Sequence, residues 1–449
     1  MITIDVILSI FQSYKTVHNL NNDEMRATKH ITIIRTEIIN KAEEYEDSNL
    51  NNIDKLICVS YLIFMKEHIN SIIHKINYLD SIPEVEQRSP EWYAQRYNLI
   101  SASSISKVLG TENARKGLLL EKIGIPSRML SNDAIIHGTI FEIVSQTLYE
   151  TRNNIKIKEY GCIPHKEHNF IGASPDGVVY NIDGFNMYNI NYDTLAVNDI
   201  PEYLTVHSFA LFGNLLEIKN PYSRTINNTI KFEYEQQITA QQEVCDLLRC
   251  DFLENKYDFY DTLDAFLEDN FEFETINALT IPQENKYIKN HTVPLNNLNK
   301  EGCEKGILLR FSNMSNSKHE GILFDMKTLY TKESINNWIS EKTKEFEDKG
   351  VFKLININYW SVNVYSVKEC MFNITDWNKL LLHSRTLWHR ILEERLLSDK
   401  EIYDKYDLES SSGEINTNKR TSTEYKERDL KKKSKNNNYS DRPKMVYNF

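Results

Sequence analysis

Glu217 and Lys219 stand two positions apart in the apolar segment 215–219, which reads LLEIK. The apolar neighbours predict a strand, and alternate side chains of a strand point to the same face, so Glu217 and Lys219 would share one. Their separation of about 6.5–7 Å suits a carboxylate that holds a divalent cation and an ammonium that reaches the water beside it. Pro221 would end the strand and leave the pair at its rim. Alone, this pattern is weak evidence for a metal site, because Glu-x-Lys is common on exposed strand faces.

Asp176 lies upstream in the turn motif Ser174-Pro175-Asp176-Gly177. Proline presets φ for a turn and glycine accepts a positive φ, so a plain hairpin turn would explain the motif. A bend between two strands could also bring the carboxylate of Asp176 next to that of Glu217. Carboxylates together with water and a substrate phosphate are the oxygen ligands that Mg²⁺ prefers.

Glu142 and a group of glutamines lie on two predicted helices, 135–149 and 234–248. Three apolar residues at helical spacing would face inward beside Glu142: Phe141, Val144 and Leu148. The second helix carries Gln236, Gln237, Gln241 and Gln242. A solvated helix face would explain either feature, so neither decides the chemistry alone.

The order of these features resembles the PD-(D/E)xK nucleases, and more narrowly the lambda-exonuclease and YqaJ-like viral recombinase family. Gly-x-x-x-Glu ending at Glu142, Ser-Pro-Asp-Gly, Glu-Ile-Lys and a Tyr-x-x-Gln helix starting at Tyr234 follow one another, and Asn-Pro-Tyr-Ser-Arg comes directly after Lys219. Upstream, Trp92 to Arg96 followed by Ile100-Ser101-Ala102-Ser103 is similar to the family's W…R…I-T-A-S segment. The resemblance covers about residues 88–250.

Two features depart from the family pattern. Thr239 stands where the family's Y-x-x-Q-x-Q helix has its second glutamine, which puts the role of that position in doubt. Asp176 and Glu217 are 41 positions apart, more than in the phage enzyme, because a segment rich in Asn, Tyr and Asp lies between them. This segment reads as an insertion at about 181–213 that could reshape the DNA channel or gate the site.

The resemblance implies roles for individual residues. Asp176, Glu217 and the carbonyl of Ile218 would bind Mg²⁺, with Mn²⁺ as a substitute, and Glu142 would complete the acidic cluster through a second metal or its water. Lys219 would orient the attacking water and help to deprotonate it, and Gln237 would steady Lys219 or the nucleophile. Five residues would bind DNA or its phosphates: Arg96, Ser101, Ser103, Ser174 and Arg224. Among these, Arg96 and Ser103 match residues that hold a 5′-phosphate.

These roles together predict a metal-dependent DNA exonuclease that acts 5′→3′ on duplex ends and releases 5′-phosphorylated products. The resemblance further implies a place in viral DNA recombination, repair or replication, with a single-strand annealing protein as partner and a homotrimer as assembly. An endonuclease or flap nuclease of the same fold is the alternative within the class. A catalytically inactive DNA-end-binding scaffold is the alternative outside it, although Glu142, Asp176, Glu217 and Lys219 are all present.

The elements that must position these residues predict a mixed α/β (α+β) fold with four parts. The apolar pattern favours an N-terminal helical bundle at 1–83. A nuclease core with a mixed central sheet flanked by helices, of the restriction-endonuclease-like PD-(D/E)xK type, would span 84–255. An accessory α+β region at 256–408 would complete it, with strands at 307–311 and 360–367 and a closing helix at 376–397. Residues 409–449 are Ser-, Asn- and Lys-rich and predict a disordered charged tail, either solubilising or with weak affinity for nucleic acid.

The composition excludes some classes of protein, but it does not by itself identify the function. The chain has 449 residues, 41% of them apolar, which is enough for a sizeable core. A net charge of −11 does not exclude DNA binding, since local basic patches can act within an acidic protein. The six cysteines form no C-x-x-C pair, which argues against a structural zinc site or an iron–sulfur cluster. We expect no membrane span, no secretory signal and an intracellular location, in the host cytoplasm or at a viral replication site.

Overall fold

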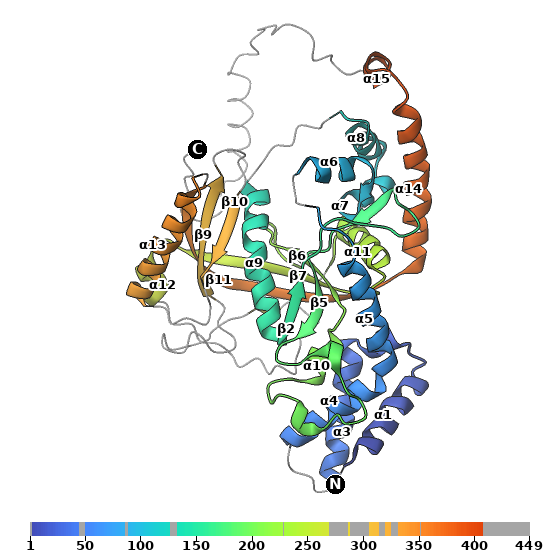
Figure 1. The fold of residues 1–449 in the computed structure, drawn as a ribbon, viewed down its shortest axis with the longest axis vertical. Coiled ribbons are helices and arrows are strands. Elements are labelled where there is room, and N and C mark those ends of the chain that lie inside the picture. The colour runs from blue at the N-terminus through green and yellow to red at the C-terminus, as the bar shows by residue number, and fades with distance from the viewer. Residues whose placement is uncertain are drawn as a thin grey trace, which may run out of the picture. The chain divides into compact units, whose positions relative to one another are not determined.

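A computed structural model describes residues 2–44, 50–85, 89–125, 133–227, 229–268, 286–287, 305–313, 319–324, 331–350 and 352–406 (Figure 1). The chain divides into two compact units, Met1–Leu392 and Glu393–Phe449. In the second unit, α15 (Asp399–Tyr406) is tied to Glu394, whose Oε1 accepts from Lys405 and from the Tyr406 hydroxyl at 2.7 and 2.8 Å. The predicted tail at 409–449 lies outside the described residues. The predicted boundaries at 83, 255 and 408 stay predictions.

The N-terminal helices pack on one another through their apolar side chains. They are α1 (Ile4–Val17), α2 (Asn22–Met25), α3 (Thr28–Glu44), α4 (Leu50–Phe64) and α5 (Lys66–Asp80). In α5, for example, the buried residues are Ile69, Ile72, Ile76 and Leu79, at the spacing of one helix face. Among the described residues, no single helix is long and apolar enough to cross a membrane, although α4 and α5 pass that test jointly as a pair bent by 69°.

The predicted insertion packs against these helices. It contains the 3-10 turns η2 (Met187–Asn189) and η3 (Val197–Asp199) and the helix α10 (Val206–Ala210). α10 packs on α3 and α4, and η3 packs on α4. In Figure 1, α10 accordingly lies among the N-terminal helices. The insertion is therefore a docking element for the helices that begin the chain.

The central sheet is mixed and has the strand order β10-β9-β11-β7-β6-β5-β2, with β8 also paired to β11. Only β6 and β7 run parallel along this order, in the described part of the chain. The strands are β2 (Ile155–Lys158), β5 (Gly177–Ile182), β6 (Leu215–Lys219), β7 (Arg249–Tyr260), β8 (Lys286–Tyr287), β9 (Lys305–Asn313), β10 (His319–Leu323) and β11 (Phe352–Met371). The accessory region thus adds strands to the sheet that carries Glu217.

A second, three-stranded sheet has the order β1-β4-β3. Its strands are β1 (Ile100–Ser101), β3 (Ile163–Pro164) and β4 (Ile171–Ala173). The neighbouring helical segments are α6 (Pro90–Tyr97), α7 (Ala102–Ile105), η1 (Ser106–Leu109) and α8 (Glu112–Lys122). Ser174, Pro175 and Asp176 directly follow β4, so this small sheet positions the turn beside β6.

Long helices flank the central sheet, as the mixed α/β prediction requires. α9 (Asp133–Asn153) packs on β2, β6 and β10, and α11 (Phe232–Cys245) packs on β6 and β7 as well as on α7 and β4. The remaining helices are α12 (Leu263–Glu268), α13 (Lys332–Asp348) and α14 (Ile374–Glu394). The mixed α/β fold class is confirmed.

The sequence pattern predicts one strand over 155–163 and one helix over 102–109, and both predictions were wrong. A single strand over 155–163 does not form, because the chain leaves the central sheet after β2 and enters the small sheet at β3. The predicted helix over 102–109 tightens into the 3-10 turn η1 after Ile105. Both errors arise where the chain passes between packed elements, and periodicity along the sequence carries no signal for such a passage.

Gly213 sets the entry into β6. Its φ is +81°, and a Cβ there would lie 2.4 Å from Cγ2 of Ile72 on α5. We expect Gly213→Ala to lower the free energy of unfolding by about 2–5 kcal/mol, because the left-handed backbone costs about 1–2 kcal/mol and the overpacking about 1–3 kcal/mol.

Urea unfolding measures this loss, with Gly117→Ala on α8 as the control. No atom lies within 4 Å of the added Cβ of the control, so it should be neutral or stabilising by up to about 1 kcal/mol. Equal losses in both variants would show that the close approach to Ile72 is unimportant.

Candidate active site

Glu217 and Lys219 lie on β6, between β5 and β7 in the central sheet. The side chain of Glu217 is fully buried, whereas that of Lys219 is half-buried at the end of the strand. Leu216 and Ile218 are buried as well, so both faces of this strand are covered. The predicted Glu-x-Lys pair is therefore not an exposed strand face, and the ammonium of Lys219 forms an ion pair with Glu217 Oε1.

Asp176 reaches the same place through strand pairing. Gly177 of β5 is paired with Leu216 of β6 in antiparallel register, which sets Asp176 opposite Glu217. The Oδ2 atom of Asp176 accepts a hydrogen bond of 2.6 Å from the backbone N–H of Ile218. The turn motif and the Glu-x-Lys strand thus converge, as the sequence analysis predicts.

Two glutamines of α11 hold the carboxylate of Glu217. Gln237 Nε2 donates to Glu217 Oε1, and Gln241 Nε2 donates to Glu217 Oε2, each at 2.6 Å. Gln241 Nε2 also lies 3.4 Å from the carbonyl oxygen of Ser174. Residues four apart lie on one face of a helix, so α11 presents both amides to one carboxylate.

The charges at this centre act strongly on one another. Burial and the negative charge of Glu217 raise the pKa of Asp176 well above its usual range. Burial alone would lower the pKa of Lys219, but the carboxylates of Glu217 and Asp176 outweigh it and raise that pKa. Lys219 therefore remains a fixed cation at neutral pH.

Glu142 joins this group from α9. Burial, followed by the charge of Glu159, raises the pKa of Glu142 to about 7, and the charge of Glu217 contributes in the same direction while Lys219 opposes it. Glu142 in turn raises the pKa of Asp176. Glu142, Asp176, Glu217 and Lys219 therefore form one electrostatic cluster, which we call the acidic centre.

Three of the predicted phosphate-binding residues lie together near the small sheet. The guanidinium of Arg96 stacks on the ring of Trp92 at 4.7 Å, and its Nη2 lies 3.4 Å from the hydroxyl of Ser101. The hydroxyls of Ser101 and Ser103 are 3.1 Å apart. Ser101 pairs with Gly172 of β4 in parallel register, two residues before Ser174. This arrangement sets the exposed Ser174 near the same strand ends.

Arg224 is paired with another side chain of the protein and is not simply exposed for contact with DNA. Its guanidinium forms an ion pair with the buried carboxylate of Glu254 on β7. Glu254 is the register partner of Lys219. The guanidinium of Arg224 and the ammonium of Lys219 both lie over the ring of Tyr234, at 5.9 and 5.3 Å. Arg224 is thus close to Lys219, and contact with DNA stays a prediction.

The acidic centre has the charge that a hard divalent cation neutralises. The charge of Glu217 raises the pKa of both Glu142 and Asp176, while the ammonium of Lys219 acts in the opposite direction. Among the described residues, however, no three His, Cys, Asp or Glu side chains are placed so that they could hold a metal ion directly. A cation bound by Asp176, Glu217 and the Ile218 carbonyl would therefore need further oxygens from water or a substrate phosphate, and it would compete with the ammonium of Lys219.

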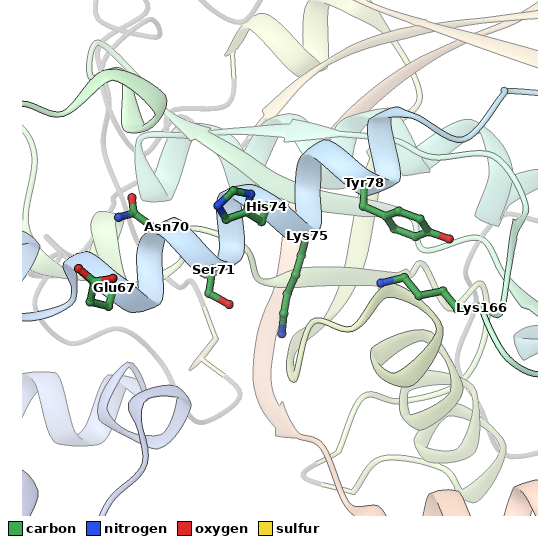
Figure 2. Close-up of a pocket in the computed structure, with 7 residues that line it drawn as sticks. All are labelled: Glu67, Asn70, Ser71, His74, Lys75, Tyr78 and Lys166. Carbon is green, nitrogen blue, oxygen red and sulfur yellow. The ribbon is translucent and has the colours of Figure 1, made fainter.

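A different part of the protein has an open groove along one side of α5 (Figure 2). Six of its lining residues come from α5, and Lys166 adds its ammonium 4.0 Å from the ring of Tyr78. Lys75 in this groove also lies 3.1 Å from the carboxylate of Asp246. None of the predicted site residues lines this groove, so it is separate from the acidic centre.

Residues 91–247 match the family described as the YqaJ-like viral recombinase domain. This segment is a YqaJ-like viral recombinase domain. It lies within the predicted nuclease core and contains the whole acidic centre together with Arg96, Ser101, Ser103, Ser174 and Arg224. The YqaJ-like domain and its acidic centre together support the assignment of this protein as a nuclease.

The curated relatives are viral. An uncharacterized protein of Acanthamoeba polyphaga mimivirus is 26% identical over 423 residues, which cover 85% of this chain and 70% of that protein. A protein of African swine fever virus is 28% identical over 162 residues, which cover 34% of this chain and 45% of that protein. The match to the second relative thus spans less than half of its length.

The solved structures that resemble this chain include two of an alkaline exonuclease, LHK-Exo, from Laribacter hongkongensis. The complex with dAMP aligns with a TM-score of 0.35 and 15% identity, over 71% of this chain and 98% of that chain. The second structure aligns with a TM-score of 0.28 and 24% identity, over 37% and 74%. At these TM-scores the overlay is loose.

Three residues of the site have no predicted role in the sequence analysis. Gln241 holds Glu217, Glu159 acts on Glu142, and Glu254 holds Arg224. The spacing of Gln237 and Gln241 was a usable signal, because four residues make about one helical turn. Glu159 and Glu254 carry no such signal, since their positions depend on strand pairing.

Proposed function

We propose that this protein is a metal-dependent DNA exonuclease that acts 5′→3′ on duplex ends and leaves 5′-phosphorylated products. The observation that supports it most is the convergence of Glu142, Asp176, Glu217 and Lys219 inside the YqaJ-like domain. The viral relatives favour a role in viral DNA recombination, repair or replication in an infected host cell. A single-strand annealing protein as partner and a homotrimer belong to the same proposal.

Asp176, Glu217 and the Ile218 carbonyl would hold Mg²⁺, for which Mn²⁺ could substitute, and Glu142 would act through a second cation or its water. A divalent cation in that place lowers the pKa of a water molecule and offsets charge on the phosphate in the transition state. Lys219, kept protonated by the two carboxylates, donates hydrogen bonds from Nζ to orient the water or a phosphate oxygen. Gln237 and Gln241 keep Glu217 in one orientation.

The test uses linear duplexes with 5′-phosphate or 5′-hydroxyl ends and a covalently closed circle, each with Mg²⁺, Mn²⁺ or EDTA. We expect Mg²⁺-dependent loss of the linear duplexes from their 5′ ends, with the phosphorylated end preferred and the circle intact. Cleavage of the circle would identify an endonuclease instead. No cleavage with either metal, but binding to duplex ends, would identify an inactive end-binding scaffold.

Arg96 should determine the preference for a 5′-phosphate. Removing a charge-assisted bond to a phosphate costs about 1.5–3 kcal/mol, so Arg96→Ala should lower kcat/KM on phosphorylated ends by roughly 10- to 100-fold. Activity on 5′-hydroxyl ends should hardly change, and the ratio of the two rates measures the effect. Arg115→Ala is the matched control, because Arg115 lies on the neighbouring helix α8 and its side chain donates to the carbonyl of Gly110, just before that helix. An unchanged ratio in Arg96→Ala would place the phosphate pocket elsewhere.

A further inference from the structure

Gln241 is a fully buried polar residue in contact with both segments that carry the predicted metal ligands. Its Nε2 donates to Glu217 Oε2 on β6 at 2.6 Å. The same atom lies 3.4 Å from the carbonyl oxygen of Ser174, two residues before Asp176. One amide therefore connects the strand that carries Glu217 with the turn that carries Asp176.

The two oxygens of Glu217 are held separately. Gln237 and Lys219 bind Oε1, whereas Gln241 is the donor to Oε2 in the described part of the chain. Hydrogen bonds to a charged acceptor are stronger than neutral ones and fix its orientation. Loss of Gln241 would free the carboxylate to rotate about the side that Gln237 still holds. Oxygen ligands that must meet one small cation cannot tolerate such rotation.

Gln241 is also set apart from its neighbour Gln242. Gln242 is almost fully buried too, but its Nε2 donates to the carbonyls of Leu248 and Cys370, at 3.0 and 2.8 Å. Both of those bonds tie α11 to backbone at the start of β7 and the end of β11, and neither touches a carboxylate. The two glutamines thus have the same size and similar burial, and only one contacts the acidic centre.

We propose that Gln241 is a positioning residue that orients Glu217 relative to Asp176 and thereby sets the affinity of the acidic centre for a divalent cation. This inference rests on the proposed function, because it assumes that Asp176 and Glu217 bind the cation. It extends the helix motif by two residues beyond Thr239, the position where the family pattern has its second glutamine. In this chain, Gln241, one helical turn after Gln237, provides the second hydrogen bond to Glu217.

The experiment compares Gln241→Met and Gln242→Met in the full chain. Mn²⁺ affinity without DNA is measured by electron paramagnetic resonance, and kcat and KM for a linear duplex are measured with saturating Mn²⁺ and with Mg²⁺. We expect Gln241→Met to weaken Mn²⁺ binding by about 10- to 100-fold, as loss of a residue that supports a metal ligand does, with kcat lowered and KM for DNA unchanged. Gln242→Met should keep wild-type Mn²⁺ affinity within about twofold.

Thermal unfolding of both variants separates positioning from packing. If both lose stability equally but only Gln241→Met loses Mn²⁺ affinity, Gln241 acts through Glu217. Wild-type Mn²⁺ affinity in Gln241→Met would overturn the proposal. Gln241→Asn, which keeps the amide but shortens its reach, replaces the Met variant should that variant not fold, and the same loss is expected.

Failure of the proposed function has a different signature. A wild-type protein that binds Mn²⁺ but cleaves no DNA would contradict the nuclease, while the affinity ratio of variant to wild type would still decide the role of Gln241. A wild-type protein that binds no Mn²⁺ would overturn both.

Discussion

Lys219→Ala is expected to lower kcat for cleavage of linear duplex DNA by about 10³-fold, because it removes the cation that the proposed mechanism places beside the attacking water and the phosphate. The ammonium is fixed by the ion pair with Glu217 and by the ring of Tyr234 at 5.3 Å, so it is already oriented before DNA binds. Affinity for duplex ends should stay within a few-fold of wild type. Single-turnover cleavage and a separate DNA-binding titration measure the two quantities.

The control for this prediction is Lys231→Ala. The ammonium of Lys231 lies 5.7 Å from the same ring of Tyr234, but it faces Glu233 on the exposed start of α11. Removal of Lys231 should change kcat by less than about twofold, since an exposed ion pair contributes little. If Lys219→Ala kept more than a tenth of wild-type kcat, the proposed role of Lys219 would be wrong, whatever the effect on DNA binding.

The proximity of Asp176 and Glu217 could be predicted from the sequence, because two short-range rules determine their positions. Turn chemistry puts Asp176 at a bend, and side-chain alternation puts Glu217 on a strand that Pro221 ends. Antiparallel pairing of Gly177 with Leu216 then leaves little freedom for the two carboxylates. Local patterns predict a site well when its residues lie at the ends of adjacent elements.

The supporting residues could not be predicted in the same way. Whether Gln241 contacts Glu217 or solvent depends on which face of α11 meets β6, and the helix is polar on more than one face. Glu254 faces Arg224 because β7 runs parallel to β6, a pairing that joins segments without any local signal. The strand β7 itself was not predicted, since Lys and Asp residues at its end interrupt the apolar alternation.

The position of the N-terminal helices is a second feature that sequence patterns do not determine. Each apolar stripe predicts a helix with one buried face, but it does not say what covers that face. In the structure, α1, α3 and α4 pack on one another, and α10 and η3 of the insertion at 181–213 cover α3 and α4 further. The buried guanidinium of Arg26 is the main polar link between these parts, and its removal provides a strong test of their coupling.

Arg26→Ala is expected to lower the free energy of unfolding by about 3–5 kcal/mol, because the loss of one member of a buried charged network leaves its partners unpaired. Arg26 is 3% exposed, and its guanidinium binds the Ala210 carbonyl at 3.1 Å, the Asn214 side chain at 3.0 Å and the Phe212 carbonyl. Burial, together with the nearby charge of Arg249, lowers the pKa of Arg26 to about 10, so it stays charged at neutral pH.

Urea unfolding of Arg26→Ala should be compared with that of Arg35→Ala. Arg35 binds Asp54 through two bonds of 2.7 and 2.8 Å, but this pair is partly exposed and should be worth about 1 kcal/mol or less. Since Asn214 directly precedes β6, Arg26→Ala should also lower the temperature at which Mn²⁺ binding is lost, in parallel with unfolding. Equal losses of stability in the two variants would mean that the N-terminal helices do not support β6 through Arg26, and the strand that carries Glu217 would then be stabilised by the sheet alone.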